Sequence, residues 1–235
     1  MTRAIAVVIP TYNEAANLEG LARSVLERVP DATIIVVDDN SPDGTGAIAD
    51  RLAQETGRLS VIHRFSKDGI GPAYIAGFKA ALESDVELIV AMDADGSHSP
   101  ADLVRMLDAS ETADLVIGSR YVDGGSTVGW PLHRKLLSRA GGVYSRLVLR
   151  APINDLTAGF KVYRRDALAA LPLDRLKSDG YSFQIETTWR TWKRGFRVVE
   201  VPITFHDRVA GKSKLSRRIV IEATAIVWRL RFERS

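Results

Sequence analysis

The chain has no cysteine among its 235 residues. Disulfide bonds, thiolate metal ligands and a cysteine nucleophile are therefore excluded, and the composition fits a reducing compartment. Long hydrophobic runs are also missing. The apolar stretch at residues 4–9 is broken by Pro10, and no other run is long enough to cross a bilayer. The four histidines are scattered without zinc-site spacing. We expect neither a signal peptide nor a transmembrane helix.

The net charge of the chain is only +3, but basic residues gather near its end. From Arg208 onward there are 8 Lys and Arg residues against 2 acidic residues, Glu222 and Glu233. Such a basic segment favours phosphates, an anionic membrane or nucleic acid as partners. The sequence contains no nucleic-acid-binding motif and no basic sheet pattern with interleaved aromatics, so we expect no nucleic-acid partner.

Hydrophobic stretches alternate with helical patterns through the first half of the chain. Because the expected strands are apolar throughout, the alternation predicts an α/β fold with a parallel sheet covered on both faces. Ligands of such sheets bind beyond the carboxyl ends of the strands. The expected strands are residues 4–9, 33–37, 59–63, 88–92 and 115–117, and the expected helices are 14–29, 43–52, 72–82 and 100–109.

The second half of the chain is less regular. It predicts helices over residues 134–149, 180–194 and 215–232, and a strand over 197–205 that Pro202 interrupts. A polar loop is expected over residues 206–214. With no repeat or convincing linker, we divide the chain into a domain over residues 1–214 and a basic amphipathic helix over 215–235.

The sequence Asp93-Ala94-Asp95 closes the apolar stretch that precedes it. Because side chains alternate along a strand with a period of two, both carboxylates point the same way. Paired carboxylate oxygens suit Mg²⁺ or Mn²⁺ shared with a substrate phosphate, whereas an isolated Asp-x-Asp also occurs in solvated turns that cap helices. Polar residues also follow three other expected strands, at 10–14, 38–41 and 118–121.

Three segments together resemble the nucleotide-sugar half of the inverting family 2 glycosyltransferases, which have the Rossmann-like GT-A fold. These segments are residues 10–14 (PTYNE), 36–45 (VVDDNSPDGT) and 93–96 (DADG). Residues 118–121 (GSRY), 157–161 (TAGFK) and 205–214 (FHDRVAGKSK) are similar to the dolichol-phosphate mannose synthases within that family. Residues 129–135 (GWPLHRK) resemble the actinobacterial polyprenol monophosphomannose synthases.

The resemblance implies transfer of mannose from GDP-mannose to a polyprenyl phosphate, with inversion and a divalent cation. It implies a guanosine-side site at Pro10, Tyr12, Glu14 and Asp39, with Asp43 as a further substrate-binding residue. It implies a metal and diphosphate site at Asp93, Asp95 and Ser97, where Ser97 replaces a glutamine common in relatives. It further implies an acceptor-phosphate site at Arg120 and Arg134, a sugar site at Gly159, Gln184 and Glu186, and a loop closing over the diphosphate at Arg208, Ser213 and Lys214.

The residue types suit this chemistry. A cation held by the aspartates would neutralise the leaving diphosphate. The nucleophile is a phosphate whose second pKa is about 6, so it is already anionic and needs no strong general base. We therefore expect Asp93 to position metal and acceptor. Two alternatives remain open at this point, a polyprenyl-phosphate glucosyltransferase that uses UDP-glucose and a nucleotide-sugar-binding module without catalysis.

A lipid acceptor requires the protein to reach a bilayer without spanning it. The last expected helix carries two apolar seams, one with Ile219, Ala223, Ile226 and Leu230, the other with Ile221, Ala225, Trp228 and Phe232. These seams fit a helix lying in the membrane interface or a helix packed on the protein's own core. Residues 143–150 are a second candidate. We expect a peripheral protein on the cytoplasmic membrane face, with a separate membrane-anchoring protein as an open possibility.

Overall fold

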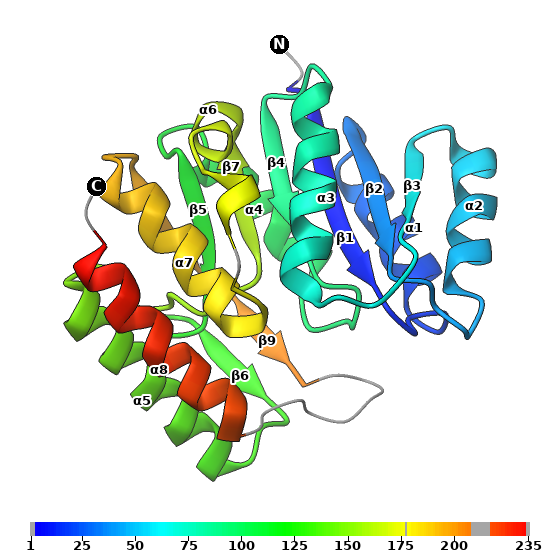
Figure 1. The fold of residues 1–235 in the computed structure, drawn as a ribbon. Coiled ribbons are helices and arrows are strands. Elements are labelled where there is room, and N and C mark those ends of the chain that lie inside the picture. The colour runs from blue at the N-terminus through cyan, green and yellow to red at the C-terminus, as the bar shows by residue number, and fades with distance from the viewer. Residues whose placement is uncertain (1–2, 177, 208–216, 234–235) are drawn as a thin grey trace.

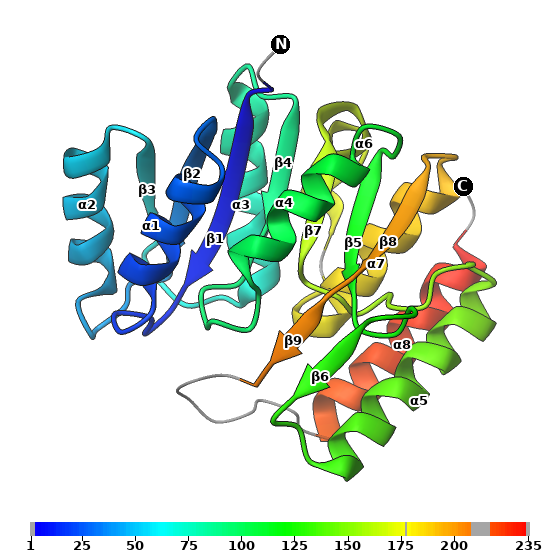
Figure 2. The same cartoon turned by 180° about the vertical axis from the view of Figure 1, so that it is seen from behind.

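The computed structural model describes residues 3–176, 178–207 and 217–233, with side chains of the last range described from residue 224 onward. A seven-stranded sheet in the order β3-β2-β1-β4-β7-β5-β8 forms the centre of the molecule. Helices cover both of its faces, as Figures 1 and 2 show from opposite sides. Its strands are β1 (Ile5–Thr11), β2 (Ala32–Asp38), β3 (Leu59–His63), β4 (Leu88–Ala91), β5 (Leu115–Ser119), β7 (Lys161–Arg164) and β8 (Val198–Pro202).

The helices divide between the two faces of the sheet. One face is covered by α1 (Leu18–Arg28), α2 (Thr45–Thr56) and α4 (Pro100–Ala109). The other is covered by α3 (Ile70–Glu83), α6 (Arg165–Ala169), the short 3₁₀ helix η1 (Leu173–Arg175) and α7 (Gly180–Lys193). A second, two-stranded sheet pairs β6 (Ser126–Val128) with β9 (Thr204–His206), and α5 (Leu132–Leu149) lies beside α8 (Arg217–Phe232).

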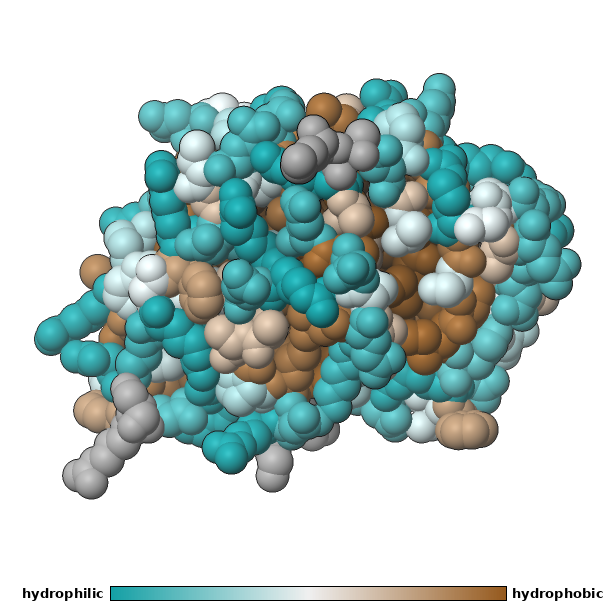
Figure 3. All heavy atoms as spheres, turned by 90° about the horizontal axis from the view of Figure 1, so that it is seen from above, coloured by the Kyte–Doolittle hydropathy of each residue, from teal (hydrophilic) through white to brown (hydrophobic). Residues whose placement is uncertain are grey.

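Alternation along the central strands feeds both hydrophobic clusters. In β1, Ala6 and Val8 join the cluster beneath α3 and α7, while Val7 and Ile9 join the cluster beneath α1 and α4. A strand that is buried on both faces reads as an uninterrupted apolar run, which is how the sequence identified it. On the face seen from above, hydrophobic residues are visible near the centre, with hydrophilic residues around them (Figure 3).

The five strands predicted in the first half of the chain are parallel to one another, as expected, but the sheet also contains β7, which was not predicted and runs antiparallel to both β4 and β5. This strand is four residues long and contains Lys161, so neither alternation nor an apolar run marked it. The strand expected over residues 197–205 is two strands, β8 and β9, because pairing with β5 ends at Pro202, which has no amide hydrogen. The helix expected from residue 43 begins at Thr45, and the Thr45 amide donates to Asp43 Oδ1 (3.0 Å) ahead of it.

The last helix packs on the protein. Contacts link α8 to α5 and α7, and Ile226, Val227 and Leu230 belong to the buried cluster on that face of the sheet. Trp228 and Phe232 point away, 48% and 73% exposed, with their rings stacked at 5.6 Å. The described part of one predicted seam is therefore buried and that of the other is exposed. The division of the chain at residue 214 lies outside the described residues and stays a prediction.

Within the described part of the chain, none of the helices has the length and apolar content that a membrane span needs.

Two glycine substitutions test the packing of the fold. A Cβ on Gly77, within α3, would lie 2.3 Å from Val8 Cγ1 of β1, whereas a Cβ on the exposed Gly141 of α5 meets nothing within 4 Å. We expect Gly77→Ala to cost ~1–3 kcal/mol of unfolding free energy through overpacking. Gly141→Ala should instead stabilise by about 0.5–1 kcal/mol, since alanine favours helix. Urea unfolding of both variants measures this. Equal changes in the unfolding free energy of the two variants would contradict the close contact between α3 and β1.

Candidate active site

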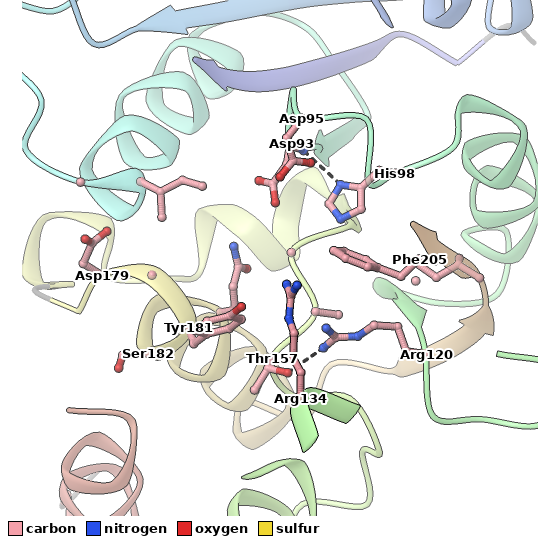
Figure 4. A pocket seen from close by; sticks show the side chains of 18 of the residues that line it. Asp93, Asp95, His98, Arg120, Arg134, Thr157, Asp179, Tyr181, Ser182 and Phe205 are labelled. Atoms are coloured by element: carbon pink, nitrogen blue, oxygen red, sulfur yellow. Dashed lines mark hydrogen bonds between the residues drawn. The ribbon is translucent and has the colours of Figure 1, made fainter. Parts of the chain in front are cut away.

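Two adjoining cavities lie at the carboxyl ends of β1, β2 and β4. The larger has a volume of about 340 Å³ and the smaller about 90 Å³. Both are lined by Lys67, Gly69, Ile70, Asp93 and Asp95, so they form one continuous groove. Figure 4 shows the larger cavity, with the two aspartates on one side and Arg134 reaching toward them from the other. The edge of the sheet chosen from the sequence is therefore where the groove lies.

Asp93 and Asp95 enter this groove from the loop after β4, and neighbouring hydroxyls hold both carboxylates. The hydroxyl of buried Tyr74 donates to Asp93 Oδ1 at 2.7 Å. Burial, and then the Asp93 charge, raise the pKa of Tyr74 well above its usual value, so the hydroxyl stays a donor. Ser97 donates to Asp95 Oδ1 through its amide (3.1 Å) and its hydroxyl (2.5 Å). Ser97 thus lies behind Asp95 and lines neither cavity.

These oxygens fit a hard divalent cation. Within the described ranges, no group of three or more His, Cys, Asp or Glu side chains gathers to hold a metal ion. A cation bound by Asp93 and Asp95 would therefore share its coordination with ligand oxygens, which is the usual arrangement for Mg²⁺ beside phosphates.

The smaller cavity brings together four residues predicted for the guanosine side. Pro10, Tyr12, Glu14 and Asp39 all line it. Arg64 donates to Asp39 Oδ1 at 2.6 Å, and Lys67 Nζ lies 3.5 Å above the centre of the Tyr12 ring. Burial raises the pKa of Asp39, and the Arg64 charge opposes that rise.

Asp43 lies outside the cavity lining and connects the loops on either side of it. Its carboxylate accepts from the Ala15 amide (3.1 Å) and from the Thr45 amide (3.0 Å). In this position it joins the loop after β1 to the start of α2, so it supports the smaller cavity from behind.

Arg120 and Arg134 line the larger cavity opposite the aspartates, and each is paired with a carboxylate. Arg120 donates to both oxygens of buried Asp155, at 2.7 Å each, and to Thr157 Oγ1 at 2.8 Å. Arg134 donates to Asp207 Oδ1 at 2.9 Å, and its guanidinium carbon lies 4.1 Å from the centre of the Trp130 ring.

The Arg120–Asp155 pair is closed to solvent. Burial alone would raise the pKa of Asp155, but the Arg120 charge and hydrogen bonds outweigh it and leave that pKa below its usual value. A carboxylate with a lowered pKa stabilises the fold above its unfolded-state pKa, and this contribution is lost as the pH falls through the lowered value. Arg120 is therefore a fixed cation in the wall at neutral pH.

The sugar-side predictions divide between the groove and the region behind it. Gly159 and Gln184 line the larger cavity. A Cβ on Gly159 would lie 3.3 Å from Asp93 Oδ2 and 3.5 Å from Gln184 Nε2, so this glycine permits a close approach. Glu186 lies outside the lining, fully buried, where it pairs with Arg190 at 2.8 Å. Arg208, Ser213 and Lys214, predicted for the closing loop, lie outside the described residues.

Several lining residues were missed from the sequence. His98 is the clearest, since its Nδ1 accepts from the Asp93 amide at 3.1 Å and its ring stacks on Phe160. Burial lowers the pKa of His98, which favours the neutral ring that this hydrogen bond requires. Its place three residues after Asp95 was a usable signal. Other missed residues come from the start of α3 and the loop before it, from the α7 region and from β9 with the residue before it. Among them are Lys67, Asp179, Tyr181, Ser182 and Phe205.

Residues 6–171 match the family described as glycosyl transferase family 2, and the chain belongs to that family. It is 50% identical to an undecaprenyl-phosphate mannosyltransferase of Micrococcus luteus, covering 96% of this chain and 93% of that protein. It is also 50% identical to a polyprenol monophosphomannose synthase of Mycolicibacterium smegmatis, covering 94% of this chain and 84% of the relative. This protein is therefore a glycosyltransferase.

Solved structures with much lower sequence identity share the fold. A glucosyl-3-phosphoglycerate synthase of Mycobacterium tuberculosis, bound to Mn²⁺ and UDP, is 20% identical with a TM-score of 0.71, covering 99% of this chain and 80% of that one. A mannosyltransferase of Pyrobaculum calidifontis, bound to GDP-mannose and Mn²⁺, is 20% identical with a TM-score of 0.65, covering 97% and 65%. The expected GT-A fold is thereby confirmed.

Tyr74→Phe tests whether the hydroxyl that holds Asp93 matters for metal binding. The variant keeps the ring packed between Phe78 and Phe183 and removes only the donor to Asp93. We expect Mn²⁺ to bind about tenfold more weakly in the presence of nucleotide, because partners of metal ligands orient them. Electron paramagnetic resonance titration of free Mn²⁺ measures this. The matched control is Tyr163→Phe, also buried but away from the groove, and an equal effect there would contradict the prediction.

Proposed function

We propose that this enzyme transfers mannose from GDP-mannose to a polyprenyl phosphate with inversion at the sugar carbon. The observation that carries the proposal is the opposition of charges across one groove, with Asp93 and Asp95 on one wall and Arg134 on the other (Figure 4). Both relatives that are 50% identical are named for mannose transfer to polyprenyl phosphates. The Pyrobaculum mannosyltransferase, which shares the fold, holds GDP-mannose.

The three parts of the sugar donor would occupy successive parts of the groove. The nucleoside would occupy the smaller cavity, beside Tyr12 and Asp39, and the diphosphate would lie at the two aspartates shared by both cavities. The hexose would then enter the larger cavity, above Gly159. Mg²⁺ or Mn²⁺ held by Asp93 and Asp95 would supply Lewis-acid neutralisation of the departing diphosphate. Two solved structures of the same fold hold Mn²⁺ with their nucleotide ligands.

The acceptor phosphate would approach from the arginine wall. A phosphate oxygen attacks the first carbon of mannose, the bond to the diphosphate breaks, and GDP leaves on the aspartate side. Because the nucleophile and leaving group then lie on opposite faces of the sugar, the configuration inverts. The phosphate is already anionic near neutral pH, so Asp93 need not remove a proton. Arg134 and Arg120 offset the repulsion between two phosphates.

A transfer assay separates this function from its alternatives. Purified protein is offered a short polyprenyl phosphate with GDP-mannose or UDP-glucose, each with Mg²⁺, with Mn²⁺ and with EDTA. We expect transfer only from GDP-mannose and its loss in EDTA. Transfer only from UDP-glucose would overturn the donor, and activity unchanged in EDTA would overturn the metal site. Nucleotide binding without transfer would instead favour a nucleotide-sugar-binding module without catalysis, or an enzyme that needs a separate membrane partner.

Exposed apolar side chains on α5 and α8 support contact with a membrane surface. Four of them follow one stripe of α5 at helical spacing, namely Leu132, Leu136, Val143 and Leu147. Trp228 and Phe232 add an exposed aromatic pair on the neighbouring α8. A peripheral enzyme with such a face would meet a lipid acceptor without spanning the bilayer. The cytoplasmic face and a separate anchoring protein remain predictions from the sequence.

Flotation with anionic liposomes tests this surface. Removing the whole of α8 would also expose the core around Leu230, so we choose the paired substitution Trp228→Ser and Phe232→Ser. We expect membrane partitioning to fall at least about tenfold, since two large apolar side chains no longer enter the interface. Phe65→Ser, which removes an aromatic that is 99% exposed elsewhere, is the matched control. Unchanged flotation of the paired variant would contradict the proposal that α8 contacts the membrane surface.

A further inference from the structure

A lysine lies in the middle of the sheet with no exposed surface. Lys161 opens β7, between β4 and β5, and is 0% exposed. Its ammonium nitrogen has three acceptors, all on α7: Gln184 Oε1 at 2.7 Å, the Gln184 carbonyl at 3.0 Å and Thr187 Oγ1 at 3.1 Å. Burial lowers the pKa of Lys161 well below its usual value, which reflects the cost of placing a cation there.

This contact determines which way the Gln184 side chain faces. The oxygen and the nitrogen of a glutamine amide have similar size, so the group fits in two flipped orientations unless hydrogen bonds distinguish them. Lys161 Nζ donates to Gln184 Oε1 at 2.7 Å, so the amide oxygen faces the lysine. The amide nitrogen of Gln184 is therefore directed away from Lys161. A glutamine side chain that could otherwise rotate between two states is held in one.

The Gln184 amide nitrogen borders the floor of the groove. A Cβ placed on Gly159 would lie 3.5 Å from Gln184 Nε2, 3.3 Å from Asp93 Oδ2 and 3.7 Å from His98 Cε1. These three groups and Gly159 all line the larger cavity, so they enclose one notch over the glycine. The notch has a carboxylate on one side and an amide donor on another. A ligand oxygen placed there would find a hydrogen-bond donor fixed in position before binding.

We propose that Lys161 is a positioning residue, which holds the Gln184 amide group as a hydrogen-bond donor to a hydroxyl of the donor hexose above Gly159. The proposal rests on the proposed function, in which the hexose occupies this part of the groove. Lys161 itself does not line the cavity and acts only through Gln184. An amide donor fixed beforehand loses no rotational freedom when the sugar binds.

A purely structural lysine, which only fastens α7 to the sheet, would behave differently. Its substitution would lower the stability of the fold and weaken the use of all substrates alike. The size of this effect would be the same with or without the Gln184 side chain. The positioning role instead predicts that the two residues act as one unit. The two roles are therefore separated by a double-mutant cycle and by comparing ligands with and without the hexose.

The cycle uses Lys161→Met, Gln184→Met and the double variant in the full chain. Methionine keeps the length of both side chains, and the double variant leaves neither the ammonium nor the amide without its partner. The measurements are kcat/KM for GDP-mannose at saturating polyprenyl phosphate, and the inhibition constant for GDP. We expect each single variant to lower kcat/KM about tenfold, with the double variant no worse than Gln184→Met, while GDP inhibition changes less than about twofold.

Two further variants keep the test decisive if Lys161→Met does not fold. Gln184→Glu gives Lys161 a carboxylate partner but removes the amide donor, so we expect a folded protein with kcat/KM for GDP-mannose lowered at least tenfold. Thr187→Val, the matched control, removes one Lys161 acceptor and leaves the Gln184 side chain in place. It should keep kcat/KM within about twofold of wild type.

The outcomes are distinct. If the losses of kcat/KM in the two single variants multiply in the double variant, the positioning role is overturned in favour of a structural one. The same holds if GDP inhibition weakens as much as kcat/KM for GDP-mannose falls. Full activity in Gln184→Glu would overturn the donor role of the amide. Failure of the wild-type protein to bind GDP or to use GDP-mannose would overturn the proposed donor and is seen before any variant is compared.

Discussion

The site depends on holding like charges close together before any substrate arrives. Two carboxylates meet on one wall of the groove and two guanidinium groups on the other, and each pair repels itself. Each of these charged groups is held in place, against this repulsion, by a hydrogen-bonding or oppositely charged partner. Tyr74 and Ser97 hold the aspartates, while Asp155 and Asp207 pair with the arginines. Because these partners are supplied by α3 and by three separate loops, the charges keep fixed positions across the cavity.

This arrangement gives burial a functional purpose. The Arg120–Asp155 pair is almost wholly removed from solvent, where removing one partner of such a pair costs about 3–5 kcal/mol. Lys161, deeper in the sheet, is also fully paired. The fully paired Arg120, Asp155 and Lys161 make this part of the wall rigid, whereas partly satisfied groups would be costly there. In the proposed reaction rigidity matters because both substrates are charged, and reorganising a solvated wall around them would weaken the stabilisation of the leaving diphosphate.

The groove and the apolar face of α5 are connected through one helix. Arg134, in the first turn of α5, lines the cavity, and the exposed leucines of the same helix continue outward from it. A membrane surface held against α5 and α8 would therefore place lipid phosphates near the arginine wall. The last helix serves two needs at once, since Ile226, Val227 and Leu230 complete the core while Trp228 and Phe232 remain outside it.

The sequence by itself determined the strand–helix alternation, the edge that carries the site and the residues that follow β1, β2 and β4. Those features are local, because apolar runs and strand-end polar residues lie next to one another in the chain. Only the tertiary structure decided that β7 runs antiparallel, that Ser97 and Asp43 lie behind the groove, and that Tyr181, Ser182 and Phe205 enter its lining. Lys161 shows the reason. A lysine normally indicates a surface position, and only the return of β7 between β4 and β5, beneath α7, surrounds it with acceptors. Contacts between segments distant in sequence carry no signal in local spacing, so they appear only when the chain has folded.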